Sequence, residues 1–217
     1  MISARQFTLA AAALAGVALG AGAQRPSTLA LTAADLPSQL APATRQAIAR
    51  LGDSLRAARL PDEPLYAKAA EGVLKGAEDA RIVAAVRTLA RELGEARVAL
   101  GAAADDADLV AAASALHVGA TPAMLTRLQE THRAATNNGT SLAPPLVALA
   151  DLLTRRVPAP AAAAAIDSLV ARHAPADDFA ALRAAVERDI DAGRAPETSV
   201  QQRTQVLLRG LDSRRTP

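Results

Sequence analysis

Three histidines are the side chains of this chain best suited to bind a metal ion or to transfer a proton. His117 and His132 stand 15 positions apart on different expected helices, and His173 lies at a helix end. Helical metal sites usually place two ligands three or four positions apart, as in His-Glu-x-x-His, and no two of these histidines have that spacing. A histidine at a helix C-terminus interacts favourably with the helix dipole, which gives His117 and His173 a structural role.

Two acidic segments could hold a cation. The segment Asp105-Asp106-Ala107-Asp108 crowds the start of an expected helix, where carboxylates also cap free amides and match the helix dipole. The segment 189–193 has the spacing that opens a calcium loop. That loop needs glycine at its sixth position and glutamate at its twelfth, where Arg194 and Val200 stand. We therefore expect no metal site and no cofactor.

Paired carboxylates for acid–base catalysis would have to come from Glu71, Glu92, Glu95 and Glu187. Each of these glutamates fits an exposed helix face beside lysine or arginine, as Glu95 does with Arg91 four positions earlier. The sequence contains no G-x-S-x-G motif, no phosphate-binding glycine loop and no dinucleotide fingerprint. It also contains no cysteine, which removes thiol nucleophiles, thiolate metal sites and disulfides. We therefore expect a protein that is not an enzyme.

The elements that position these side chains are expected to be helices. The chain has 58 alanines among 217 residues, with two phenylalanines, one tyrosine and no tryptophan. Alanine is the strongest helix former, whereas strands prefer β-branched and aromatic residues. The composition therefore predicts an all-α protein.

The same sequence pattern recurs along the chain. An expected helix is followed by a glycine or polar residue, then by an apolar residue, and then by a proline or acidic residue that begins the next helix. Its clearest example is the segment 62–101, whose second helix carries apolar residues at spacings of three and four. We expect corners of this kind at Gly76, Gly119, Arg156, His173 and Gly193. Their spacings of 43, 37, 17 and 20 suggest a unit of about 20 residues that is sometimes doubled.

Short corners between amphipathic helices make antiparallel neighbours. We expect about eight short amphipathic helices stacked as αα-hairpins over residues 42–209, in a compact bundle or a short solenoid-like repeat. The surface turn at 136–141 is the expected place for an internal boundary. Residues 24–41 are expected to form a flexible polar tether, and residues 210–217 a frayed C-terminus.

The first 23 residues have the layout of a secretory signal peptide. Arg5 precedes an apolar stretch over 7–19, and Ala21 and Ala23 are the small residues of a cleavage site ahead of Gln24. The stretch is shorter than the ~20 residues that a membrane-spanning helix needs. We expect an exported protein of bacterial type, periplasmic or secreted, with no membrane span after cleavage. A leader that is kept as an anchor is the alternative.

Charge is distributed unevenly along the chain. Residues 24–60 and 194–217 each carry a net charge of +3, and residues 61–193 carry −5. This pattern could favour self-association or an anionic surface, although ordinary solvated helix faces explain it better. We expect no nucleic-acid binding, because the basic ends are weak, stacking aromatics are scarce and the leader directs export.

The segment Leu125-Thr126-Arg127-Leu128-Gln129 has the form Leu-Thr-x-x-Gln. It resembles the motif of small periplasmic stress chaperones of the Spy type, which are helical cradles that hold unfolded clients. The match covers five residues and fixes three, it is not repeated, and the many prolines of this chain depart from long cradle helices.

These observations lead to one functional expectation and one alternative. We expect an exported, non-catalytic helical protein that acts as a structural or protein-interaction module, through a protein partner or through self-association. The alternative is a small periplasmic holdase-type chaperone that binds unfolded proteins.

Overall fold

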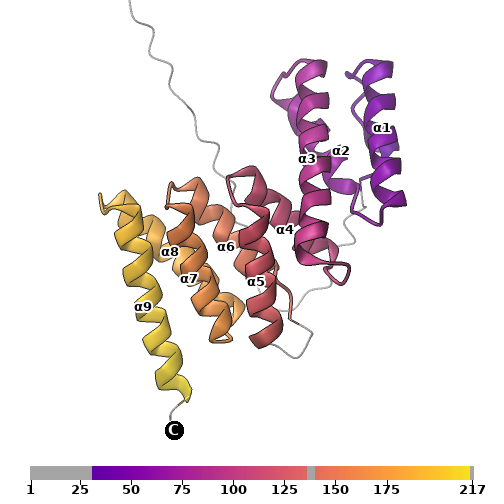
Figure 1. The fold of residues 1–217 in the computed structure, drawn as a ribbon. Coiled ribbons are helices and arrows are strands. Elements are labelled where there is room, and N and C mark those ends of the chain that lie inside the picture. The colour runs from indigo at the N-terminus through magenta and orange to yellow at the C-terminus, as the bar shows by residue number, and fades with distance from the viewer. Residues whose placement is uncertain (1–30, 136–139, 216–217) are drawn as a thin grey trace, which may run out of the picture. The chain divides into compact units, whose positions relative to one another are not determined.

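The described part of the chain is built from helices. The computed structural model describes residues 31–135 and 140–215, so the leader and its cleavage site at Ala21, Ala23 and Gln24 lie outside it. Within these ranges the chain forms nine α-helices and one short 3₁₀-helix, and no strand (Figure 1). In chain order the elements are η1 (Ala33–Asp35), α1 (Pro42–Ala57), α2 (Glu63–Leu74), α3 (Asp79–Leu100), α4 (Asp106–His117), α5 (Pro122–Ala135), α6 (Ala143–Thr154), α7 (Ala159–Ala171), α8 (Ala176–Asp191) and α9 (Pro196–Arg215).

Six helices end in the same hydrogen-bonded turn. In each turn one residue has a positive φ, between 54° and 108°, and these residues are Arg59, Gly76, Gly119, Arg156, His173 and Gly193. The N–H of the following residue donates to the carbonyl five positions earlier over 2.9–3.0 Å, which is the Schellman motif. The set contains all five residues named from the sequence as corners. It adds Arg59, which the sequence analysis did not identify.

The residue after the positive φ is apolar at five of the six corners. Leu60, Ala120 and Val157 are buried at this position. The corner at Gly193 is built differently, because Arg194 follows it and pairs with Asp189, Nη1 to Oδ2, over 2.8 Å. An ion pair therefore replaces the usual apolar contact at this corner.

The repeating unit of the array is a pair of helices. Gly76, Gly119, Arg156 and Gly193 end α2, α4, α6 and α8, and they follow one another at intervals of 43, 37 and 37 residues. The expected unit of about 20 residues is therefore a single helix with its corner. Two such helices make one repeat.

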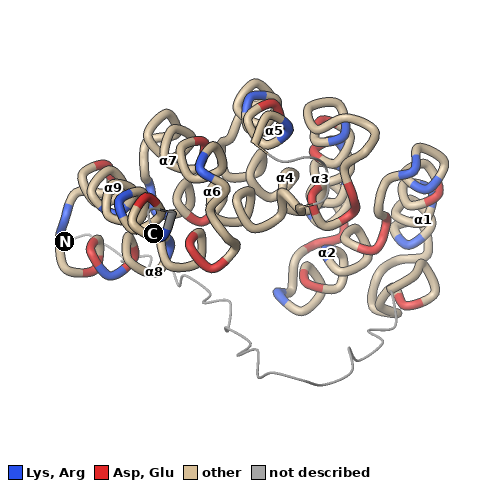
Figure 2. Tube along the Cα trace, turned by 90° about the horizontal axis from the view of Figure 1, so that it is seen from below, with Lys and Arg blue, Asp and Glu red and all other residues tan. Residues whose placement is uncertain are grey.

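The helices pack in two rows by neighbour contacts. Helices α1, α3, α5, α7 and α9 contact one another in order, and α4, α6 and α8 do the same in the second row, with α2 packed on α1 and α3 (Figure 2). Every extensive contact between described helices joins elements that are at most two apart along the chain. Such contacts are typical of solenoid-like arrays. The prediction of an all-α array of stacked αα-hairpins is confirmed.

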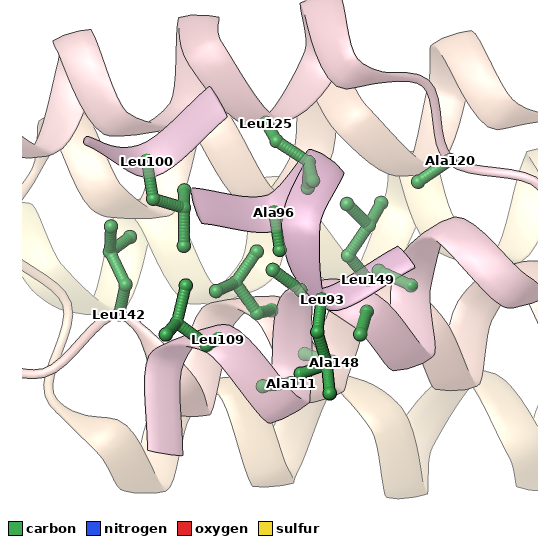
Figure 3. Packing of buried hydrophobic residues seen from close by; sticks show 14 of the residues in the cluster. Leu93, Ala96, Leu100, Leu109, Ala111, Ala120, Leu125, Leu142, Ala148 and Leu149 are labelled. Atoms are coloured by element: carbon green, nitrogen blue, oxygen red, sulfur yellow. The ribbon is translucent and has the colours of Figure 1, made fainter. Parts of the chain in front are cut away.

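Leucine and alanine fill the space between the rows. Figure 3 shows Leu93 of α3, Leu109 of α4, Leu125 of α5 and Leu149 of α6 in one buried cluster, with Ala96 among them. Small alanine side chains let helix backbones approach closely, and the leucines fill what remains. The core is therefore continuous from helix to helix.

Two glycines permit especially close approach near the N-terminal end of the array. A Cβ atom on Gly52 of α1 would lie 2.9 Å from Cζ of Tyr66 on α2, and one on Gly72 would lie 2.7 Å from Cγ1 of Ile82 on α3. Both distances are too short for a real side chain. The close packing of α2 against α1 and α3 therefore requires glycine at positions 52 and 72.

The N-terminal tether expected over 24–41 is not observed in its described portion. Thr32 and Asp35 form a capping box around η1, and Leu36 and Leu40 are buried in the core. The N–H of Ala41 donates to Asp79 Oδ2 over 2.9 Å. Residues 31–41 are therefore part of the folded unit, because two leucines four positions apart find apolar partners.

The C-terminus also differs from the expected frayed segment over 210–217. Helix α9 continues to Arg215, and Leu211 is buried against the array. Asp212 pairs with Arg172 at the C-cap of α7, and Arg214 Nη2 lies 2.8 Å from Asp178 Oδ2 of α8. Burial and ion pairs thus hold the last turns of α9, and only residues 216–217 lie outside the described helix.

The internal boundary expected at 136–141 falls mostly outside the described residues. On either side of it, α4 packs on α6 and α5 packs on α7.

Candidate functional site

Two adjoining recesses meet at the end of α5, and we call them together the His132 hollow. They share His132, Thr140 and Ser141. One recess, of about 400 Å³, is mainly apolar and is lined by Pro144, Pro145, Val170, Pro175 and Phe179, together with His173. The other, of about 440 Å³, is the more polar of the two, and Asp105, Asp108, Gln129 and Arg133 line it beside Ala103, Ala104 and Leu142.

The start of α4 supplies the acidic wall of the polar recess. Asp105 caps the helix, its Oδ1 accepting the N–H of Asp108 over 2.8 Å. Asp108 is only 8% exposed, and its Oδ1 accepts the hydroxyl of Ser141 over 2.8 Å. Ser141 Oγ in turn accepts the N–H of Ala143. The capping role expected for this acidic segment is therefore present, and it also ties the start of α4 to the start of α6.

His132 separates the two recesses. Its Nε2 lies 2.9 Å from Thr140 Oγ1. Burial lowers the pKa of His132, and the nearby carboxylate of Asp108 partly opposes this effect. Since the ordinary histidine pKa is already below 7, the imidazole is mostly uncharged at neutral pH.

A serine, a histidine and an aspartate thus lie close together, but their hydrogen bonds do not form a catalytic triad. The Ser141 hydroxyl donates to Asp108, and His132 Nε2 contacts Thr140. An activated serine needs its hydroxyl directed at the histidine that takes its proton. The arrangement is therefore a capping network that fixes the junction of α4, α5 and α6.

The polar recess contains one unsatisfied acceptor. Gln129 Oε1 is buried, and it has no hydrogen-bond partner within the described structure. The second oxygens of Asp105 and Asp108 likewise accept no further hydrogen bond from the residues described. The recess therefore offers several acceptors, and Arg133 is the cation among its lining residues.

The three histidines lie in two places. His132 and His173 line the same apolar recess, although 41 positions separate them in the chain. His117 ends α4, and its Nδ1 lies 3.2 Å from Glu92 Oε1 of α3. No group of three or more metal-binding side chains is present in the ranges that the structure covers.

Two of the four candidate glutamates, Glu92 and Glu95 of α3, share Arg91 as a partner, and the other two pair with different residues. Hydrogen bonds from Lys75 and Lys68 lower the pKa of Glu71. Glu95 Oε1 lies 2.6 Å from Arg91 Nη1 as expected, and Glu187 pairs with Arg155.

The prediction of an exposed helix face is wrong for Glu92. This residue is 5% exposed, because α4 packs over its side of α3. The surface pattern of a single helix could not indicate this contact.

Asp189, in the segment that resembles an interrupted calcium loop, is a structural residue. Arg203 Nε and Nη2 of α9 bind its two oxygens over 2.7 and 2.5 Å. These hydrogen bonds, with the positive charge of Arg194, lower the pKa of Asp189 to about 2. The bidentate pair joins α8 to α9.

The segment 125–129 is explained mainly by packing. Leu125 and Leu128 are buried, and the hydroxyl of Thr126 lies 3.5 Å from the carbonyl of Ala99 on α3. Only Gln129 of this segment reaches the His132 hollow.

Comparison with models of protein families, with curated proteins and with solved structures gives no match for this chain. None of the helices described is long and apolar enough to cross a membrane. The function of the protein must therefore be inferred from its residues and their geometry.

Proposed function

We propose that this chain is an exported, non-catalytic protein-interaction module that holds a partner protein against a stacked helical array. The observation that carries the proposal is the pattern of neighbour contacts in two rows. Arrays of this kind present long surfaces to which helices from several repeats contribute, and such surfaces commonly bind other proteins.

The use of charged residues between helices supports this proposal. Arg127 Nε of α5 lies 2.7 Å from Asp167 Oδ2 of α7, and Arg172, which caps the end of α7, pairs with Asp212 of α9. Each pair spans 40 positions and joins successive helices of the same row. These carboxylates hold the array together, which favours a scaffold over a catalyst.

The exposed apolar residues favour a defined partner over a general chaperone. The large side chains that are exposed stand singly on different elements, and Leu74 of α2, Val98 of α3 and Val206 of α9 are the most exposed of those described. Binding of many unfolded clients usually needs a contiguous apolar patch. A holdase-type chaperone therefore remains the second candidate, supported only by the short motif at 125–129.

The experiment that tests the proposal is cross-linking of the tagged full-length protein in its native envelope, followed by identification of the captured proteins. One dominant partner is expected. A broad range of unrelated exported proteins would favour the chaperone, and cross-links only to itself would indicate self-assembly.

A variant that lacks residues 1–23 is the control for export. It is expected to stay in the cytoplasm and to lose the partner, whereas the exported protein is expected to begin at Gln24. Cytoplasmic partners for the full-length protein would contradict the proposed export.

A further inference from the structure

The polar recess of the His132 hollow has an excess of negative charge. Asp105 and Asp108 both line it, and Arg133 is the arginine among its lining residues. Arg133 makes no ion pair with either carboxylate in the described structure. His132 stands between the recesses as a mostly uncharged group at neutral pH, so it does not offset the second carboxylate.

The carboxylate of Asp108 is the buried acidic group of the polar recess. It is more than nine-tenths buried, yet Ser141 supplies its single hydrogen bond from the described residues. A carboxylate has capacity for several donors, and burial without them is unfavourable. Gln129 Oε1 is the buried acceptor of this recess that has no partner in the described structure. Together with the two carboxylates it matches a group that brings N–H donors and a positive charge.

The adjoining recess determines which kind of chemical group can lie next to the cation. Its walls are mainly apolar and include Phe179, Val170 and prolines at the starts of α6 and α8. Its volume of about 400 Å³ is within the range of ordinary binding sites. Since the two recesses share His132, a ligand that fills both carries an apolar part directly beside a cationic part.

We propose that the His132 hollow binds a lysine or arginine side chain of a partner protein together with a neighbouring apolar side chain. This assignment rests on the proposed interaction function and names the chemistry of the partner. The ammonium or guanidinium group lies against Asp105, Asp108 and Gln129, and the apolar side chain lies against Phe179. An anionic ligand is disfavoured by the two carboxylates, and a metal ion by the small number of carboxylates and the apolar second recess.

The test uses the exported protein and two dipeptides capped at both ends, leucyl-lysine and leucyl-glutamate. Binding is followed by NMR of the imidazole groups, which suit the purpose because the chain has three histidines. His132 and His173 line the hollow, and His117 on the α3–α4 contact is an internal control. Leucyl-lysine is expected to shift the signals of His132 and His173 but not that of His117, and to bind at least about fivefold more tightly than leucyl-glutamate.

The decisive variant is Asp105→Asn. Asparagine caps a helix as well as aspartate does, so the variant removes charge from the hollow while keeping the start of α4. It is expected to lose most of the preference for leucyl-lysine. The matched control is Asp106→Asn, which removes a charge from the first turn of the same helix outside the hollow and is expected to keep the preference.

Three results would overturn the assignment: equal binding of the two dipeptides, equal effects of the two variants, or unchanged His132 and His173 signals at the solubility limit of leucyl-lysine. Repeating the envelope cross-linking with Asp105→Asn separates this inference from the proposed function. A partner captured equally by both proteins would leave the interaction module standing and exclude the hollow as its site. Selective dipeptide binding without any defined partner would support the hollow and contradict the module.

Discussion

The ring of Tyr66 lies directly against the backbone of Gly52, where a Cβ atom would come 2.9 Å from Cζ and closer still to the hydroxyl oxygen. The Tyr66 hydroxyl donates to Asp62 Oδ2 over 3.0 Å, so the ring cannot retreat without losing that bond. Asp62 also pairs with Arg56 Nε over 2.9 Å. The close contact of α1 with α2 therefore requires a residue without a Cβ atom at position 52.

Gly52→Ala is expected to destabilise the protein, although alanine is the better helix former. The added methyl group overlaps Tyr66 and should cost about 1–3 kcal/mol of unfolding free energy, as overpacking does. Urea unfolding measures the change. The control is Gly94→Ala in α3, where an added Cβ meets no described atom within 4 Å and should stabilise by about 0.5–1 kcal/mol. Two variants of equal effect would contradict the close contact.

A side chain added at a corner glycine and a side chain removed at Arg156 are expected to have opposite effects on the free energy of unfolding. Gly76→Val and Gly119→Val should each destabilise by about 1 kcal/mol or more, because a β-branched residue disfavours a positive φ. Arg156→Gly should stabilise by roughly 0.5–1 kcal/mol, since arginine holds a φ of 63° there. Chemical denaturation of all three variants tests the corners. A stable Gly119→Val protein would show that the φ at this corner is not required.

Asp189 is expected to make folding stability depend on acid pH. Its pKa is lowered from 3.8 to about 2, so its stabilising contribution is present above pH 4 and is lost as pH falls toward 2. Asp189→Asn should therefore lower the urea midpoint at pH 7, and its difference from the wild type should shrink between pH 4 and 2. Asp191→Asn, an exposed residue at the same helix end, should leave both the midpoint and its pH profile unchanged. A constant difference at all pH values would refute the role of the ionised carboxylate.

The buried Glu92 is expected to depend on His117. Its Oε1 lies 3.2 Å from the imidazole and 3.9 Å from Arg91, and its Oε2 has no hydrogen-bond partner in the described part of the chain. His117→Ala should destabilise by about 1–2 kcal/mol by leaving a buried carboxylate poorly satisfied. In a Glu92→Met background the same change should have little effect, because the carboxylate is gone. A double-mutant cycle measures this coupling, and additive effects would contradict it.

Much of the fold could be predicted because its signals are local. Val157-Pro158 and Ala174-Pro175 follow Arg156 and His173, so even corners without glycine carry a recognisable pattern. The corner at Arg59 has the same pattern in Leu60-Pro61.

The terminal segments were harder to predict because their order comes from tertiary contacts. Leu36 and Leu40 have helical spacing, whereas the prolines nearby indicate a loop. Neither local pattern shows that both leucines are buried in the core. Leu211 continues the apolar series of Leu207 and Leu208. Its burial, however, depends on where α7 and α8 lie.

The His132 hollow could not be predicted from spacing in the sequence. Asp108 and Ser141 are hydrogen-bonded although 33 positions separate them. Phe179 joins the same site from α8. The sequence indicated a capping role for the acidic segment, and that role is observed, but nothing local indicated that the cap forms one wall of a recess.

The 37-residue interval between Gly119, Arg156 and Gly193 bears on how such a chain can change its size. A segment of that length, copied or deleted in frame, returns every later helix to the row it occupied before. One such segment added or removed therefore adds or removes one helix pair and preserves the alternation of the two rows. The exposed faces of the pairs are then free to differ from one another, while the corners stay at the same interval.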